Sequence, residues 1–113
     1  MIYSFGDIII THFPFTDGVS SKPRPALVLC DVNDGDITIA RITSSLIPLL
    51  SHTVTIKGWE LAGLYKPSIL NMAKLISIHK SLVMSHIGHL QTDEKSVIAK
   101  AFLLFYANSL STN

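Results

Sequence analysis

Short apolar runs separated by polar turn residues fill the first eighty positions of the chain, and this pattern predicts β-strands. The runs are rich in β-branched residues or alternate between apolar and polar positions, as strands do. They cover residues 8–13, 25–31, 37–43, 52–56 and 69–78. Between the second and third runs, Asn33-Asp34-Gly35-Asp36 predicts a hairpin turn, because Asp-Gly favours tight turns. These two strands are therefore expected to pair antiparallel.

The end of the chain has a helical pattern instead. Apolar residues recur at helical spacing over residues 97–105. Thr92 suits an N-cap, and Asp93 and Glu94 after it suit the positive end of the helix dipole. We therefore expect a helix from Thr92 to about Asn108, with its apolar stripe packed on the strands.

The order of these elements predicts the fold class. Residues 80–86 are expected to form one or two helical turns, and residues 88–90 a short link. Five or more strands joined as successive hairpins and closed by one helix predict a mainly β fold. The expected architecture is a small, partly closed barrel of antiparallel strands with a helical cover.

Composition limits the possible functions. The 113 residues are expected to form one domain that spans residues 1–113. Hydrophobic residues make up 48% and charged residues 15%, which indicates a folded, core-rich protein with room for a self-association surface. The net charge of +1 excludes a broad basic face, so a nucleic-acid function would depend on a few placed residues.

Cysteine content and hydropathy indicate the compartment. Cys30 is the single cysteine and lies in an apolar run, so we expect a buried thiol and no disulfide framework. No apolar stretch approaches the roughly 20 residues of a membrane span, and the N-terminus does not resemble a signal peptide. We therefore expect a cytoplasmic protein without membrane contact.

Arg24 is unusual because a proline stands on each side of it. Proline fixes its own φ and pushes the preceding residue into an extended conformation, so both prolines stiffen Pro23-Arg24-Pro25. The apolar run Ala26–Cys30 follows, which places Arg24 at the mouth of a buried strand. Its permanently charged guanidinium matches phosphate or carboxylate oxygens. The alternative is that Pro-Arg-Pro only shapes the end of a loop.

Hydroxyl groups are expected beside this arginine. Thr43 ends the third strand, and the start of one antiparallel strand lies beside the end of the next, so Thr43 should meet Arg24. Ser44 and Ser45 follow directly. None of these groups readily accepts a proton near neutral pH, so the site suits a reaction in which the substrate itself supplies the nucleophile. RNA does so, because its 2′-hydroxyl attacks the adjacent phosphorus while the enzyme aligns the backbone and stabilises the charge.

Several segments together resemble the MazF/PemK toxin family, the RNA-cleaving toxins of bacterial toxin–antitoxin pairs. One matching segment is Lys22-Pro23-Arg24-Pro25-Ala26-Leu27-Val28-Leu29, and its Arg-Pro-Ala-Leu-Val part, residues 24–28, is the most specific of all. The others are Gly6-Asp7-Ile8-Ile9, Phe13-Pro14-Phe15-Thr16-Asp17, Ile42-Thr43-Ser44, Pro67-Ser68, Lys74-Leu75-Ile76-Ser77-Ile78 and Ile87-Gly88-His89-Leu90. They follow the family's order and spacing, and together they cover most of the chain.

The resemblance implies an SH3-like, CcdB-like barrel and a homodimer. It implies a toxin that cleaves single-stranded RNA, including mRNA, at short sequences by 2′-hydroxyl transesterification, with no metal or other cofactor. Arg24 and Thr43 match the family's catalytic pair: Arg24 would stabilise the pentacoordinate phosphate, and Thr43 would position the scissile phosphate. A cognate antitoxin is also implied, with a disordered acidic segment that folds into the RNA groove. No residue emerges as a general base.

Further residues are expected to contact the RNA. They are Phe15, Lys22, Ser44, Ser45, Lys74 and His79. Phe15 offers a ring on which a base can stack, whereas Phe13 is expected in the core. The family often has a polar or basic residue where Ile76 stands and an acidic residue where His79 stands, so the resemblance does not fix the recognition sequence.

Two other functions remain open from the sequence. One is a non-catalytic RNA-binding barrel, against which the expected pairing of Arg24 with Thr43 argues. The other is a gyrase inhibitor on the same barrel. Those related toxins act through a C-terminal Trp-Gly-Ile, whereas this sequence ends Ser111-Thr112-Asn113. A zinc site at His86 and His89 is disfavoured, because no cysteine or carboxylate partner is near them in sequence.

Overall fold

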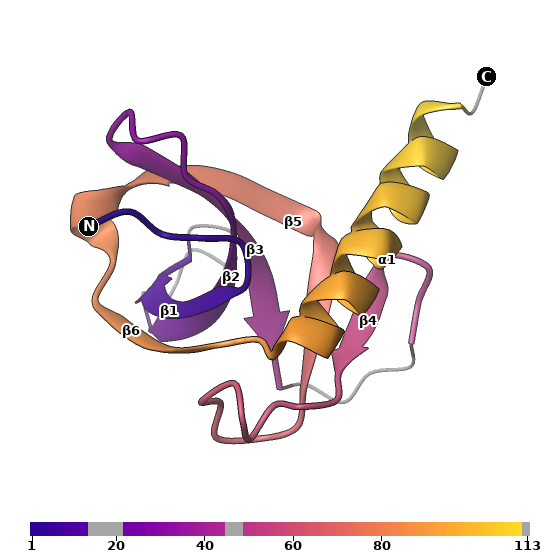
Figure 1. Cartoon of the computed structure of the whole chain (residues 1–113), viewed down its shortest axis with the longest axis horizontal. Helices are drawn as coiled ribbons and strands as arrows, with labels where there is room; N and C mark the ends of the chain where they lie inside the picture. Colours follow the sequence, from indigo (N-terminus) through magenta and orange to yellow (C-terminus); the bar gives the residue numbers. More distant parts are fainter. Residues whose placement is uncertain (14–21, 45–48, 112–113) are drawn as a thin grey trace.

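Six strands and one long helix make up the described part of the chain (Figure 1). The computed structural model describes residues 1–13, 22–44 and 49–111. In chain order, the strands are β1 (Asp7–His12), β2 (Pro23–Cys30), β3 (Asp36–Thr43), β4 (Thr53–Ile56), β5 (Ser68–His79) and β6 (Ser85–His89). The 3₁₀ turn η1 (Lys80–Leu82) joins β5 to β6, and the helix α1 (Thr92–Leu110) follows β6.

The six strands form one antiparallel sheet in the order β4-β5-β3-β2-β1-β6. The sheet curls strongly, with α1 lying beside β4 and β5 (Figure 1). Strand β5 bends where its register with β3 jumps from Leu75, opposite Ala40, to Asn71, opposite Arg41. The expected mainly β, antiparallel fold with one C-terminal helix is confirmed, and the sheet is a curled half-barrel.

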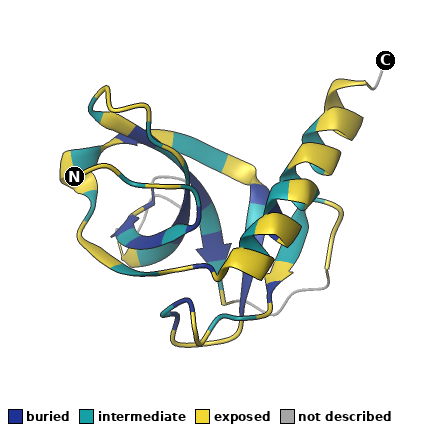
Figure 2. Cartoon of the chain, viewed as in Figure 1, coloured by how far each residue is buried: buried dark blue, intermediate teal, exposed yellow. Residues whose placement is uncertain are grey.

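Side chains from both faces of the curled sheet build two apolar clusters. On the face toward α1, Ile8 and Leu27 pack with Ile98 of the helix. Neighbouring residues of the same strands point to the other face. That second cluster contains Ile9, Phe13, Ala26, Val28, Ile37, Ile39 and Ile78. The central strands are therefore buried on both faces (Figure 2), which explains why the sequence has continuous apolar runs there.

Helix α1 covers the first cluster with one side only. Ile98 is fully buried, and Phe102 packs partly buried against the cluster. The hydroxyl of Tyr106 donates to the carbonyl oxygen of Met72 in β5, and burial raises the pKa of Tyr106. Within the described part of the chain, no helix is both long and apolar enough to cross a membrane.

The helix is less buried than its sequence pattern predicted. Val97 and Leu104 were expected to pack but are 60% and 64% exposed, because α1 touches the sheet along a narrow line and turns its outer side to solvent (Figure 2). The N-cap residue is Gln91, not Thr92, and it makes no capping side-chain hydrogen bond. The helix ends at Leu110, slightly beyond the expected end.

Two other expectations were wrong. Gly88 and His89 do not belong to a short link but to β6, which pairs with β1. A glycine and two histidines interrupt the alternation of apolar residues in this strand, so its pattern is weak. Cys30 is exposed instead of buried, because a bulge after Val28 shifts the end of β2.

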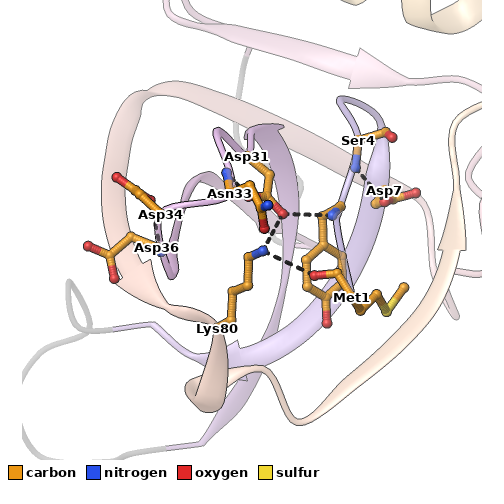
Figure 3. Close-up of polar contacts among 9 residues, drawn as sticks. Met1, Ser4, Asp7, Asp31, Asn33, Asp34, Asp36 and Lys80 are labelled. Atoms are coloured by element: carbon orange, nitrogen blue, oxygen red, sulfur yellow. Dashed lines mark hydrogen bonds and ion pairs between the residues drawn. The ribbon is translucent and has the colours of Figure 1, made fainter.

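A carboxylate ties the N-terminus to the β2–β3 hairpin (Figure 3). The Asp31 side chain is enclosed, accepts hydrogen bonds from the backbone N–H groups of Tyr3 (2.7 Å) and Asn33 (2.8 Å), and pairs with the Lys80 ammonium at 2.9 Å. Lys80 also donates to the carbonyl oxygen of Met1 at 3.0 Å. Burial by itself raises the pKa of Asp31, but these hydrogen bonds and the Lys80 charge outweigh it and lower the pKa below its ordinary value.

We expect Asp31→Asn to lower the melting temperature, because an amide cannot match the charge of Lys80. The folded-state pKa of Asp31 is lowered, so its contribution to stability is complete above the unfolded pKa of about 3.9. That contribution is lost as the pH falls through the folded value. The difference in melting temperature between wild type and variant should therefore shrink below about pH 4.

Melting curves recorded at about pH 3 to 7 measure this difference. Asp36→Asn is the matched control, since Asp36 is exposed at the same hairpin. A difference between wild type and Asp31→Asn that stays constant over the whole pH range would contradict the assigned role of the carboxylate.

Candidate functional site

The register of β2 and β3 brings Arg24 and Thr43 together. The two strands pair Val28 with Ile39 and Ala26 with Arg41. Two residues further along the same antiparallel register, Arg24 stands opposite Thr43. Directly opposite residues share a face of the sheet, and so do residues two apart on one strand. Arg24, Arg41 and Thr43 therefore lie on one face, at the end of the sheet away from the hairpin turn.

The two prolines coincide with the point where β2 and β3 separate. Strand β2 stays paired with β1 as far as Pro23, opposite His12. Its pairing with β3 stops at Ala26, directly after Pro25. Proline has no N–H to donate to a ladder, so the prolines account for the opening of the sheet at this end. Arg24 and Thr43 thus face an open space.

A pocket of about 450 Å³ occupies this space. That volume lies within the range typical of small-molecule and ligand sites. Strands β2 and β3 form one side of it, and the segment before β5 forms the other. The lining residues are Ile10, Arg24, Pro25, Arg41, Ile42, Thr43, Ser44, Leu64, Tyr65, Lys66, Ser68 and Ile87.

The pocket concentrates positive charge. Arg24, Arg41 and Lys66 all line it, and none of the described lining residues is acidic. The chain as a whole has a net charge of only +1, so this density of cations is local. A cleft lined by one sign of charge attracts ligands of the opposite sign. With hydroxyls at Thr43 and Ser44, the pocket has the donors that phosphate oxygens require.

Close backbone contacts hold the far wall of the pocket. A Cβ at Gly63 would lie 2.3 Å from the carbonyl oxygen of Ile87, and a Cβ at Gly88 would lie 2.1 Å from that of Ala62. Gly63 also has a φ of +92°, a conformation that other residues rarely adopt. Only glycine permits this approach of the segment to β6. The contact lies two residues before Tyr65, which is 84% exposed and lines the pocket.

The same segment is anchored to the helix. The carboxylate of Glu94, in the first turn of α1, accepts hydrogen bonds from the backbone N–H groups of Lys57 (2.6 Å) and Gly58 (2.9 Å). A carboxylate near a helix N-terminus also interacts favourably with the helix dipole. The wall that carries Tyr65 and Lys66 is therefore held at both β6 and α1.

The structure brings together some of the residues expected at the site. Arg24, Thr43 and Ser44 line the pocket. Lys22 is exposed just before β2, and Lys74 is exposed in the bent part of β5, but neither is among the residues lining the pocket. Phe15 and Ser45 lie outside the described residues.

His79 lies far from the other expected site residues. It pairs with Asp36 at the hairpin end of β3, seven residues from Thr43. At about 3.3 Å per residue, that separation is about 23 Å along the strand. Its ring hydrogen-bonds Ser81 at the start of η1. The structure therefore does not bring His79 together with Arg24 and Thr43.

Three pocket residues were missed by the sequence reasoning. Arg41 stands two residues before Thr43, so the alternation of β3 was a usable signal for placing both on one face. Tyr65 and Lys66 lie in a long connection without periodicity, and nothing in their local sequence pointed to the pocket. Among the described residues, no group of three or more His, Cys, Asp or Glu side chains could hold a metal ion.

Comparison with known proteins identifies relatives. A family model described as the PemK-like, MazF-like toxin of type II toxin–antitoxin systems matches residues 4–106. No curated protein sequence matches the chain. The Mycobacterium tuberculosis toxin MazF-mt6 has a similar structure, with a TM-score of 0.71 and 22% identity, covering 89% of this chain and 96% of that chain. An endoribonuclease in complex with its cognate antitoxin, from a mycobacterial species, aligns with a TM-score of 0.72 and 13% identity, covering 93% and 95%.

Proposed function

Because the chain belongs to the PemK-like, MazF-like toxin family of type II toxin–antitoxin systems, we propose that it is a sequence-specific endoribonuclease for single-stranded RNA, including mRNA. Residues 1–113 would form its single domain. The observation that carries the proposal is the pocket in which Arg24 and Thr43 share one face of the sheet. Two similar structures bear the names of an endoribonuclease and of a MazF toxin, which supports the same activity here.

The proposed reaction uses a nucleophile from the substrate. The 2′-hydroxyl of the nucleotide before the cut loses its proton to water as it attacks the adjacent phosphorus, and the 5′-oxygen of the next nucleotide leaves and takes up a proton from water. The products are a 2′,3′-cyclic phosphate and a 5′-hydroxyl. The enzyme has to hold the attacking 2′-oxygen, the phosphorus and the leaving 5′-oxygen in line. It also has to stabilise the charge that develops on the phosphoryl oxygens. No metal or other cofactor takes part.

Arg24 and Thr43 have different roles in this mechanism. The planar guanidinium of Arg24 donates hydrogen bonds to two non-bridging oxygens. These hydrogen bonds become stronger as the negative charge on the oxygens increases. The hydroxyl of Thr43 donates to one oxygen and fixes the orientation of the scissile phosphate. Because the prolines on either side stiffen Arg24, less ordering remains to be done when the substrate binds.

Two protein partners belong to the proposal. One is a cognate antitoxin whose acidic segment folds over the positive pocket, as supported by the antitoxin bound to the similar mycobacterial endoribonuclease. The other is a second copy of the chain, forming a homodimer. The outer side of α1 supports this, because Leu103 and Leu110 are 72% and 83% exposed there.

We expect Arg24→Ala to lower kcat/KM for RNA cleavage by about 100- to 1,000-fold, the usual effect of removing one group that stabilises charge in the transition state. Thr43→Val should lower it by about 10- to 100-fold, because one hydrogen bond to a charged oxygen is lost. The assay follows cleavage of a synthetic single-stranded RNA in the presence of a chelator. Lys100→Gln is the control, since Lys100 is an exposed cation on α1 outside the pocket. Full activity of a folded Arg24→Ala variant would contradict the mechanism.

The antitoxin and RNA are expected to compete for the pocket. Adding antitoxin should raise the apparent Kd for an uncleavable RNA in proportion to the antitoxin concentration, because both ligands need the Arg24 region. Fluorescence anisotropy of the labelled RNA measures this. Formation of a ternary complex with unchanged RNA affinity would show that the two ligands bind different surfaces.

A homodimer predicts a molar mass of twice the 12.4 kDa chain in solution. Sedimentation equilibrium at micromolar concentration measures it. Replacing the exposed Leu103 by Glu should shift the mass toward the monomer, whereas Asp36→Asn at the β2–β3 hairpin, away from α1, should not. A monomeric wild-type protein would rule out this part of the proposal.

A further inference from the structure

Arg41 has an unsatisfied donor in the described structure. Its Nε atom is shielded from solvent, and it is the one buried side-chain nitrogen or oxygen of the described residues without a hydrogen-bond partner. Leaving a charged donor buried and unpaired is costly, so native proteins usually supply a partner. Because Arg41 also lines the pocket, its guanidinium is a candidate to bind a ligand there.

The position of Arg41 indicates which ligand atom it meets. It stands two residues before Thr43 on the same face, which places their Cα atoms about 7 Å apart. Its partner in β2 is Ala26, which lies two residues after Arg24 and on the same face of the sheet. The spacing of Arg41 and Thr43 is comparable with the distance between successive phosphorus atoms along an extended RNA backbone.

The surroundings exclude an ordinary structural ion pair among the described residues. No acidic residue lies among the described lining of the pocket, and no salt bridge to Arg41 is found there. The other cations of the pocket, Arg24 and Lys66, repel the guanidinium instead of pairing with it. An anionic ligand in the pocket would relieve this repulsion.

We propose that Arg41 binds the phosphate next to the scissile one, so that the pocket holds two successive phosphates of the RNA. This inference rests on the proposed function for the identity of the scissile phosphate. Arg24 and Thr43 hold the phosphate that reacts, and Arg41 holds its neighbour. Fixing two successive phosphates restricts the rotation of the nucleotide between them, which helps to align the attacking oxygen with the bond that breaks.

Salt dependence of RNA binding tests the inference independently of cleavage. The probe is a short, fluorescently labelled single-stranded RNA with 2′-O-methyl groups throughout, which cannot be cleaved by its own 2′-oxygens. Each phosphate neutralised on single-stranded nucleic acid contributes about 0.7 to the slope of log K against log salt concentration. Arg41→Gln should therefore reduce the magnitude of the slope by about 0.7, whereas Arg41→Lys should keep it.

Lys100→Gln serves as the matched control, because it removes one positive charge outside the pocket and should leave the slope unchanged. Thermal melting of each variant verifies that it folds. A folded Arg41→Gln variant with the slope and affinity of wild type would overturn the inference. If wild type binds the RNA but cleaves no unmodified RNA, the proposed function fails, while the slope still decides the role of Arg41. If wild type binds no RNA at all, both are overturned.

Neutral linkages locate the second phosphate. In a cleavable RNA, a methylphosphonate replaces the phosphate that directly precedes the scissile phosphate or the one that directly follows it. Each replacement removes one charge and leaves the rest of the backbone unchanged. At one of these positions, the replacement should lower kcat/KM of wild type by about tenfold or more, the usual range for a lost charged hydrogen bond. The same replacement should have no further effect on Arg41→Gln. Equal losses in wild type and Arg41→Gln at both positions would contradict the assignment.

Discussion

The antiparallel register of β2 and β3 is the constraint on which the pocket depends. Side chains alternate between faces, so a slip of one residue would turn Arg24 away from Thr43. The buried pair Val28–Ile39 resists such a slip, because a slip would exchange side chains between the two apolar clusters and disrupt the close packing of both. At the far end, Asp31 fixes the hairpin to the N-terminus and to Lys80. Packing at one end of the sheet thus sets the geometry of charged groups at the other.

Charged side chains have different surroundings at the two ends of this sheet. Asp31 and Lys80 form a pair in which each charge has hydrogen-bond partners, and this arrangement stabilises the fold. In the pocket, by contrast, cations gather without a described carboxylate, and the Nε atom of Arg41 has no described partner. Such an arrangement costs stability in the free protein. The two apolar clusters offset that cost, and the cations of the pocket remain available to bind an anionic ligand.

The central hairpin and its chemistry could be predicted from the sequence because their signals are local. Asp34-Gly35 marks the turn, and alternation on either side fixes which residues meet, so Arg24 and Thr43 were placed correctly at one end of the sheet. Strand β6 could not be predicted, because its pairing with β1 depends on residues nearly eighty positions apart. Tyr65 and Lys66 reach the pocket through the contact between Gly63 and β6, which no local pattern indicates. The burial predicted for Cys30 from its apolar run was wrong, because a bulge after Val28 shifts the end of β2.

The central claim is that Arg24 and Thr43 hold a phosphate which the RNA's own 2′-hydroxyl attacks. Its most direct test uses a synthetic RNA with a mapped cut and the same RNA with a single 2′-deoxynucleotide before that cut, both in the presence of a chelator. The end groups are identified by mass spectrometry. The account predicts a 2′,3′-cyclic phosphate from the first RNA and no cleavage of the second at that position. Cleavage of the 2′-deoxy substrate at the same bond, or a product with a 3′-hydroxyl, would contradict it.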